Sequence, residues 1–144
     1  MLTIKPQISS QTGQPAIWKE GKMWKVRCII TPTNVNSPGN ANPYVQGGDA
    51  LDLTTILSAM LGQALPTFDL ASLVLIVSQR PAGGANNANL YEYNFAPGTT
   101  LQNGTMQVFT GAAAQTALTE LAAGNYPAGV LNDTIVATCE FFMP

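Results

Sequence analysis

The segment MWKVRCIIT, residues 23–31, alternates between apolar and polar side chains. The apolar residues that fall on one side of an extended chain are Trp24, Val26, Cys28 and Ile30. The polar residues Lys25, Arg27 and Thr31 fall on the other side. A period of two is typical of a half-buried strand, and it predicts that Trp24 lies in the core. Residues 16–18 and the turn residues 20–22 predict a second strand, joined to the first by a tight turn.

Further strands are expected along the rest of the chain. Residues 72–79 contain the apolar run LVLIV (73–77) and predict a strand buried on both faces. Residues 90–95 alternate, with Tyr91, Tyr93 and Phe95 on one side. Turn residues at 97–98 and 103–104 precede a strand at 105–110, and residues 133–143 predict a long final strand.

The helices are expected to be few and short. Residues 54–60 carry apolar residues at helical spacing, with Asp52 as the expected N-cap. The Ala-rich residues 112–123 predict a second helix, in which Leu118 and Leu121 pack inward and Gly124 ends the helix. Residues 126–129 predict a turn, and the Pro-, Gly- and Asn-rich residues 32–43 and 81–89 predict loops.

The order of elements predicts an all-β fold, a single-domain β-sandwich of jelly-roll type with one or two short helices. We expect residues 1–15 to form an N-terminal arm, irregular or extended and anchored by Leu2, Ile4 and Ile8. Residues 16–144 are then the sandwich. A chain of 144 residues is long enough for one such domain.

Composition indicates a surface that is partly covered by partners. Hydrophobic residues make up 46% of the chain, and only 10% is charged, against about 25% in ordinary soluble domains. Charged residues are depleted in the cores of protein interfaces. A weakly charged soluble domain without such a partner is the plainer alternative.

Charge argues against a nucleic-acid partner. The net charge is −2, with six basic residues, and phosphate binding needs several basic side chains together. The densest basic stretch contains Lys19, Lys22, Lys25 and Arg27, with Glu20 among them. It could dock an acidic partner, but the solvated face of a strand is the favoured interpretation.

No membrane association is expected. The most apolar run, residues 70–77, is much shorter than the roughly 20 residues of a spanning helix. Residues 1–10 lack the basic and apolar regions of a signal peptide. We therefore expect the chain to be made and used in the cytoplasm.

The residues offer little for catalysis. There is no histidine, which removes the commonest general base and metal ligand. Asp49 and Asp52 could form a carboxylate pair of the glycosidase type or hold calcium, but their spacing beside Gly47 and Gly48 favours turn and helix capping. We expect no enzyme activity, no cofactor and no metal.

Two other sets of residues have a structural and a functional interpretation. Cys28 and Cys139 lie in apolar strands and are expected to be free buried thiols, because a disulfide would require neighbouring strands and an oxidising compartment. Tyr91, Tyr93 and Phe95 could stack sugars or bases, but strand packing in a core or interface is favoured.

The segment YVQGGDALDL, residues 44–53, is similar to a motif of small phage head proteins, Tyr-x-x-Gly-Gly-Asp/Glu-Ala-Leu-Asp-Leu. In those proteins a Leu/Val-rich strand, an aromatic strand and a closing hydrophobic strand follow. With these elements the chain resembles the cement or decoration proteins of tailed bacteriophages.

The resemblance implies a structural protein of the virion. Such a protein binds the exterior of the major capsid lattice as a dimer or trimer, stabilises it against internal DNA pressure, and is assembled in the host cytoplasm. The segments expected to make contact are residues 1–14, 32–43 and 81–89.

Three alternatives remain open. The first is a carbohydrate- or receptor-binding head-fibre or tail module, which an exposed row of Tyr91 and Tyr93 would favour. The second is a small β-class enzyme, which a cleft with paired carboxylates would favour. The third is another morphogenesis part, such as a tail or head-completion protein, which would have a much lower copy number in the virion.

Overall fold

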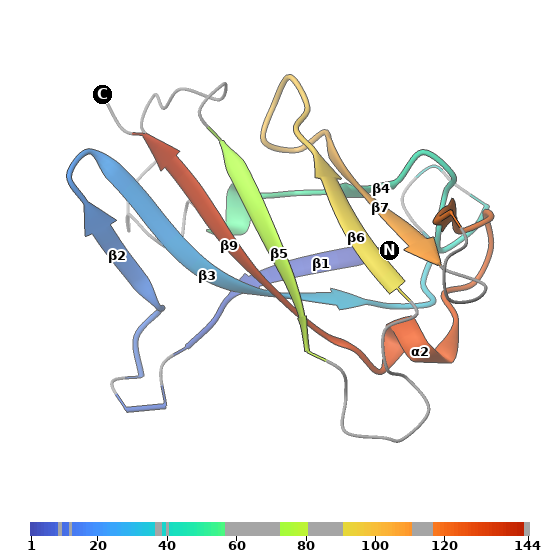
Figure 1. The fold of residues 1–144 in the computed structure, drawn as a ribbon, viewed down its shortest axis with the longest axis horizontal. Helices are drawn as coiled ribbons and strands as arrows, with labels where there is room; N and C mark the ends of the chain where they lie inside the picture. Colours follow the sequence, from blue (N-terminus) through green and yellow to red (C-terminus); the bar gives the residue numbers. More distant parts are fainter. Residues whose placement is uncertain are drawn as a thin grey trace.

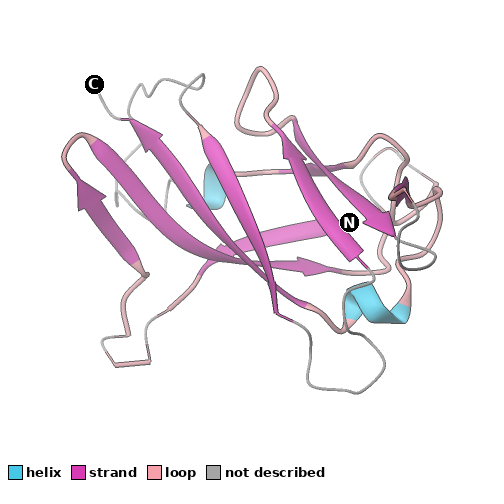
Figure 2. Cartoon of the chain, in the orientation of Figure 1, coloured by secondary structure: helices cyan, strands magenta, loops and turns pink. Residues whose placement is uncertain are grey.

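The computed structural model describes most of the chain. The described residues are 1–8, 10–11, 13–36, 39, 41–56, 73–80, 91–110 and 117–142. They are predominantly β-strand, with short helical turns (Figure 2). The expected all-β class of a single domain is thereby confirmed, whereas the jelly-roll connectivity stays a prediction.

The described strands form two antiparallel sheets (Figure 1). The first sheet has the order β1-β3-β9-β5, with β2 also paired to β3. Its strands are β1 (Leu2–Pro6), β2 (Ile17–Glu20), β3 (Met23–Pro32), β9 (Thr134–Phe142) and β5 (Val74–Arg80). The second sheet has the order β4-β7-β6, with β8 paired to β7. Its strands are β4 (Asp49–Leu51), β7 (Gly104–Thr110), β6 (Tyr91–Ala96) and β8 (Thr119–Glu120).

Strand β3 organises the first sheet, as its alternating sequence predicts. It pairs with β9 along one edge, and with β1 and β2 in succession along the other. The tight turn between β2 and β3 contains Gly21 at φ 61, a backbone conformation that favours glycine. The predicted hairpin of β2 and β3 is therefore confirmed.

One hydrophobic core lies between the two sheets. Its buried members from β3 and β9 are Val26, Cys28, Ile30, Ile135, Ala137, Cys139 and Phe141. Those from β4, β6 and β7 are Leu51, Tyr93, Met106 and Val108. Trp24 packs against this core but is only partly buried. Each fully buried large apolar side chain stabilises the fold by about 1.5–3 kcal/mol.

The N-terminal segment is part of this sheet. Leu2 and Ile4 of β1 are buried in the core, so the extended form and two of the three expected anchors are confirmed. The third anchor is wrong, because Ile8 lies beyond the strand and is exposed.

Strand β5 is not buried on both faces as its apolar run predicted. Leu73 and Leu75 are buried, but Val74 and Ile76 are exposed. β5 is the last strand of its sheet, and one of its faces packs on the core while the other is open. In the apolar run 73–77 no polar residue marks an exposed face, so the sequence pattern does not distinguish a strand buried on both faces from a strand buried on one face.

Two predictions near the C-terminal third are wrong. Thr119 and Glu120 form strand β8 instead of a helix, and Leu118 is exposed; only Leu121 packs inward as expected. At Thr119 and Glu120, pairing with β7 replaces the predicted helix; residues 111–116 of that prediction lie outside the described residues. The expected turn at 126–129 instead leads into α2 (Ala128–Leu131), which begins after Pro127.

Other local predictions are confirmed within the described residues. Residues 33–36, 39 and 41–43 form no regular element, and residues 54–56 are helical. The remainder of the helix predicted at 54–60 and the loop predicted at 81–89 lie outside the described residues. The final strand agrees with its predicted bounds to within a residue at each end.

Candidate functional site

The motif segment folds around Asp49, the first residue of β4. Gly47 and Gly48 adopt φ values of 97° and 100°, which turn the chain back on itself. The N–H of Val45 donates to Oδ1 of Asp49 at 3.0 Å, across this turn. Asp49 is only 1% exposed, so its carboxylate caps the turn from inside the protein.

The second carboxylate oxygen of Asp49 joins distant parts of the chain. The hydroxyl of Tyr126 donates to Oδ2 at 2.7 Å. The α-amino group of Met1 lies 3.4 Å from the same oxygen and also donates to the carbonyls of Thr33, Val35 and Pro43. We call Asp49, Tyr126 and the amino group of Met1 the Asp49 cluster.

A second buried tyrosine extends the network. The hydroxyl of Tyr44 donates to Oε1 of Glu120 at 2.8 Å and accepts from the N–H of Val108 at 3.2 Å. Its ring meets the ring of Tyr126 edge to face, with centroids 5.4 Å apart. Burial is the main cause that raises the pKa of both tyrosines above the usual value, so both hydroxyls stay protonated donors.

Asp52 lies apart from Asp49. It is exposed after the end of β4, and its Oδ1 accepts from the N–H of Thr54 at 2.9 Å. The two aspartates therefore point to different sides of the chain and do not form a carboxylate pair. The predicted capping roles of both are confirmed by these hydrogen bonds. Among the described residues there is no group of three metal-ligating side chains.

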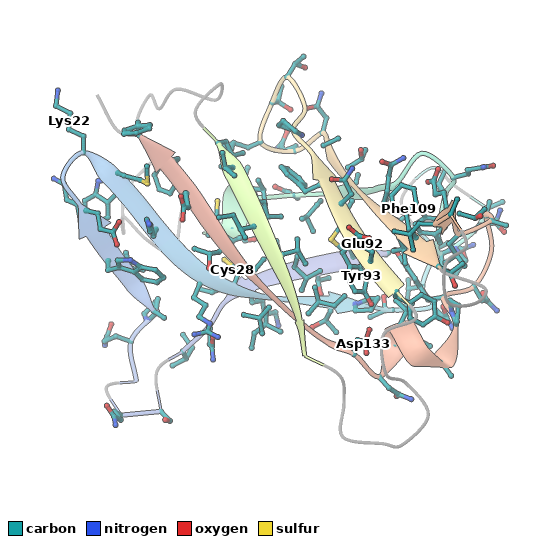
Figure 3. All side chains as sticks on the ribbon, viewed as in Figure 1. Lys22, Cys28, Glu92, Tyr93, Phe109 and Asp133 are labelled. Carbon is teal, nitrogen blue, oxygen red and sulfur yellow. The ribbon has the colours of Figure 1, made fainter. Side chains whose placement is uncertain are left out.

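The aromatic row of β6 faces inward. Tyr93 is buried, and Tyr91 and Phe95 pack against the core. The hydroxyl of Tyr93 donates to Oδ2 of Asp133 at 2.7 Å (Figure 3). Core packing is confirmed for these aromatics, and they do not provide the exposed row that a sugar-binding platform would need.

The two cysteines lie on neighbouring strands, as a disulfide would require, but they are not opposite each other. Cys28 pairs with Ala137, and Cys139 pairs with Val26. Both are free and buried, which confirms the prediction. Burial raises the pKa of the Cys139 thiol to about 12, and it also raises the pKa of Cys28.

The open side of the first sheet carries large apolar side chains. The strand registers place Trp18, Lys25, Glu140 and Val74 in one row across β2, β3, β9 and β5. The next row contains Arg27, Thr138 and Ile76. Glu20 and Phe142 lie on the same side at the hairpin end. We call these nine side chains the outer face.

Four residues of the outer face are unusually exposed for their type. They are Trp18 at 40%, Phe142 at 46%, Val74 at 52% and Ile76 at 52%. Sequence reasoning missed all four. The exposure of Phe142 could have been predicted, because it follows Phe141 in a strand whose side chains alternate between the two faces. The apolar residues of β5 do not indicate which of its faces is exposed.

The basic stretch does not form a single patch. Lys25 lies between two carboxylates, 2.9 Å from Glu20 and 3.3 Å from Glu140. The hydrogen bond that the Lys25 ammonium donates to Glu20 is the main cause that raises the pKa of Lys25. Lys19 lies on the opposite side of the sheet, with its ammonium 5.3 Å from the centre of the Trp24 ring. Lys22 is in the exposed hairpin turn, where its side chain points away from the sheets (Figure 3).

Comparisons with protein-family models, curated proteins and solved structures found no match to this chain. Within the described residues, none of the helices has the length and hydrophobicity needed to cross a bilayer.

Proposed function

We propose that this chain is a cement or decoration protein of a tailed-phage head. It binds the outer surface of the major capsid lattice, as a dimer or trimer, and stabilises that lattice. The observation that carries the proposal is the outer face, with its four exposed large apolar side chains. The resemblance of residues 44–53 to phage head proteins supplies the class of partner.

The outer face has the properties of a protein-binding surface. Groups of exposed apolar residues mark interaction sites more often than isolated ones do. Val74 and Ile76 are neighbours on one side of β5, and Trp18 lies at the other end of the same face, beyond Lys25 and Glu140. Three of its four charged side chains are already paired with one another, because Lys25 contacts both Glu20 and Glu140. A partner that covers this face therefore gains apolar burial without leaving those charges unpaired.

The motif itself supports the fold of such a protein. Its two glycines form the turn, its first aspartate holds the Asp49 cluster, and its second caps residues 54–56. These contacts tie the N-terminal segment and the residues around Tyr126 to β4. A rigid framework of this kind lowers the entropy lost when a surface docks.

Stabilisation of the lattice follows from binding linkage. A protein that binds the mature lattice, but not its dissociated subunits, stabilises it by about 2.7 kcal/mol per site at a free concentration one hundredfold above Kd. An oligomer that contacts several subunits gains further affinity through avidity.

Co-sedimentation tests the proposal. Purified protein is mixed with mature heads and with unexpanded proheads of the phage that encodes it, and binding is measured by quantitative gel densitometry. We expect saturable binding to mature heads at hundreds of copies. A copy number of a dozen or fewer would indicate a connector or tail part instead, and no binding to heads would reject the proposal.

A further inference from the structure

A pocket of about 350 Å³ opens beside β3, where the chain leaves β1 and returns as β2. It is lined by Gln7, Ile8, Ser10, Gln11, Ala16 and Arg27. The loop between β1 and β2 projects from the lower edge of the sheet (Figure 1). The pocket thus lies where this loop meets the outer face.

Backbone hydrogen bonds hold the walls of the pocket. The N–H of Gln7 donates to the carbonyl of Arg27 at 2.8 Å, and the N–H of Ala16 donates to the carbonyl of Gln7 at 2.8 Å. The N–H of Arg27 donates to the carbonyl of Ala16 at 3.0 Å. These three bonds close a ring of main-chain contacts, so the pocket has its shape before any ligand arrives.

Arg27 differs from its neighbour on the same face. Lys25 contacts two carboxylates, whereas no carboxylate of the described residues lies within 4.0 Å of the Arg27 guanidinium. Arg27 is nevertheless half-buried, and its strand partner on β9 is the neutral Thr138. A guanidinium presents a planar fork of N–H donors that matches a carboxylate.

The wall of the pocket has further unused hydrogen-bonding capacity. The amide oxygen of Gln7 is buried and has no hydrogen-bond partner within the described part of the chain. A buried acceptor without a partner costs about 1–3 kcal/mol. A ligand that brings a backbone N–H beside its carboxylate would, after a small movement of the Gln7 side chain, satisfy both groups.

We infer that this pocket receives the carboxylate of an Asp or Glu side chain from the protein that the outer face binds. Arg27 is its ion-pair partner, and exposed Ile8 and Ile76 contact the apolar residues around it. The inference rests on the proposed function for the identity of that protein. A protein carboxylate fits better than a nucleic-acid phosphate, because one unpaired arginine among apolar and amide groups is far from a phosphate-binding surface.

The test compares Arg27→Gln with Lys22→Gln in the head-binding assay. Both variants remove one positive charge, but Lys22 lies at the hairpin tip, outside the pocket and the outer face. We expect Arg27→Gln to weaken binding at least tenfold and Lys22→Gln to change it less than twofold. Arg27→Lys keeps the positive charge but lacks the planar set of N–H donors, so its affinity for heads should lie between those of the wild type and Arg27→Gln. Circular dichroism and the thermal midpoint establish that each variant is folded.

Salt provides a second readout. Raising NaCl should weaken binding of the wild type more than that of Arg27→Gln, because the variant lacks the ion pair. Equal affinities of the wild type and Arg27→Gln for heads would overturn the inference and leave the proposed function standing.

If wild-type protein does not bind heads, the proposed function fails and the pocket is tested alone. The probes are N-acetyl-aspartate amide and, as a matched neutral control, N-acetyl-asparagine amide. A saturable NMR shift of the Arg27 Nε–H with the aspartate probe only would support carboxylate recognition. No shift, or equal shifts with both probes, would overturn it.

Discussion

The hydroxyl of Tyr126 donates a hydrogen bond of 2.7 Å to the carboxylate of Asp49, which lies 77 residues earlier in the chain. Both side chains are buried, at 2% and 1% exposure. This contact attaches the turn before β4 to the segment that precedes α2. It also explains why an aspartate beside two glycines is a structural residue here.

Replacing Asp49 by asparagine should lower the free energy of unfolding by about 2 kcal/mol, because the hydrogen bonds to a buried carboxylate become weaker and one amide N–H is misplaced. The matched control is Asp52→Asn, which should change stability by less than about 0.5 kcal/mol because asparagine caps a helix equally well. Urea unfolding followed by fluorescence measures both. Equal effects of the two substitutions would contradict a special role for Asp49.

The two glycines of the motif should respond differently to alanine. Both have positive φ, but a Cβ at Gly48 would meet the backbone carbonyl carbon of Met106 at 3.0 Å, whereas nothing lies within 4 Å of one at Gly47. We expect Gly47→Ala to cost about 1 kcal/mol from backbone strain. Gly48→Ala should cost about 1–3 kcal/mol more, since overpacking adds to that strain. Unfolding midpoints in urea rank the two variants.

Stability should decrease at alkaline pH. The folded protein raises the pKa of Cys139 from 9.0 to about 12, and it also raises the pKa of Tyr126 above 10.0. In the unfolded chain these groups lose their protons first, so the unfolded state binds fewer protons and gains stability as pH rises. The stabilising contribution is complete below pH 9 and is lost through the range up to the folded pKa values.

The slope of stability against pH tests this directly. Each such group can lower the unfolding free energy by up to about 1.4 kcal/mol per pH unit above its unfolded pKa. Urea titrations at intervals from pH 7 to pH 11 measure the decline. In Tyr126→Phe the decline above pH 10 should be shallower than in the wild type; an unchanged free energy up to pH 11 would refute the prediction.

Polar substitutions on the outer face should affect binding more than folding. Val74→Thr and Ile76→Thr replace half-exposed β-branched side chains by another β-branched residue, so we expect changes in stability within about 0.5 kcal/mol. Head binding should weaken markedly if the proposed interface buries these side chains. Leu118→Thr is the control, since Leu118 is 49% exposed but precedes β8 of the second sheet, off the outer face. A similar loss of binding in all three variants would argue against this face.

The sequence was most informative where one face of an element is polar. The alternation in β3 predicts which of its side chains are buried, and Val26, Cys28 and Ile30 are buried as expected. The turn at Gly21 and the capping by Asp52 are also predictable, because they depend on residues a few positions apart. These features are local, so one stretch of sequence contains all the information they need.

Prediction failed where the outcome depends on a distant strand. The alanines before β8 favour a helix, but Thr119 and Glu120 find backbone partners on β7. The apolar run of β5 gives no indication of which side is covered. Val74 and Ile76 are exposed because the core packs against the other face of the first sheet, where Leu73 and Leu75 are buried.

The sequence alone therefore determined the β class, the central hairpin and the inward side of β3, because a period of two commits alternate side chains to opposite faces. Tertiary structure decided the partners of Asp49, the unpaired state of Arg27 among the described residues, and the exposure of the outer face. These depend on strand order and register, which bring together residues as far apart as Asp49 and Tyr126 and which no single segment specifies.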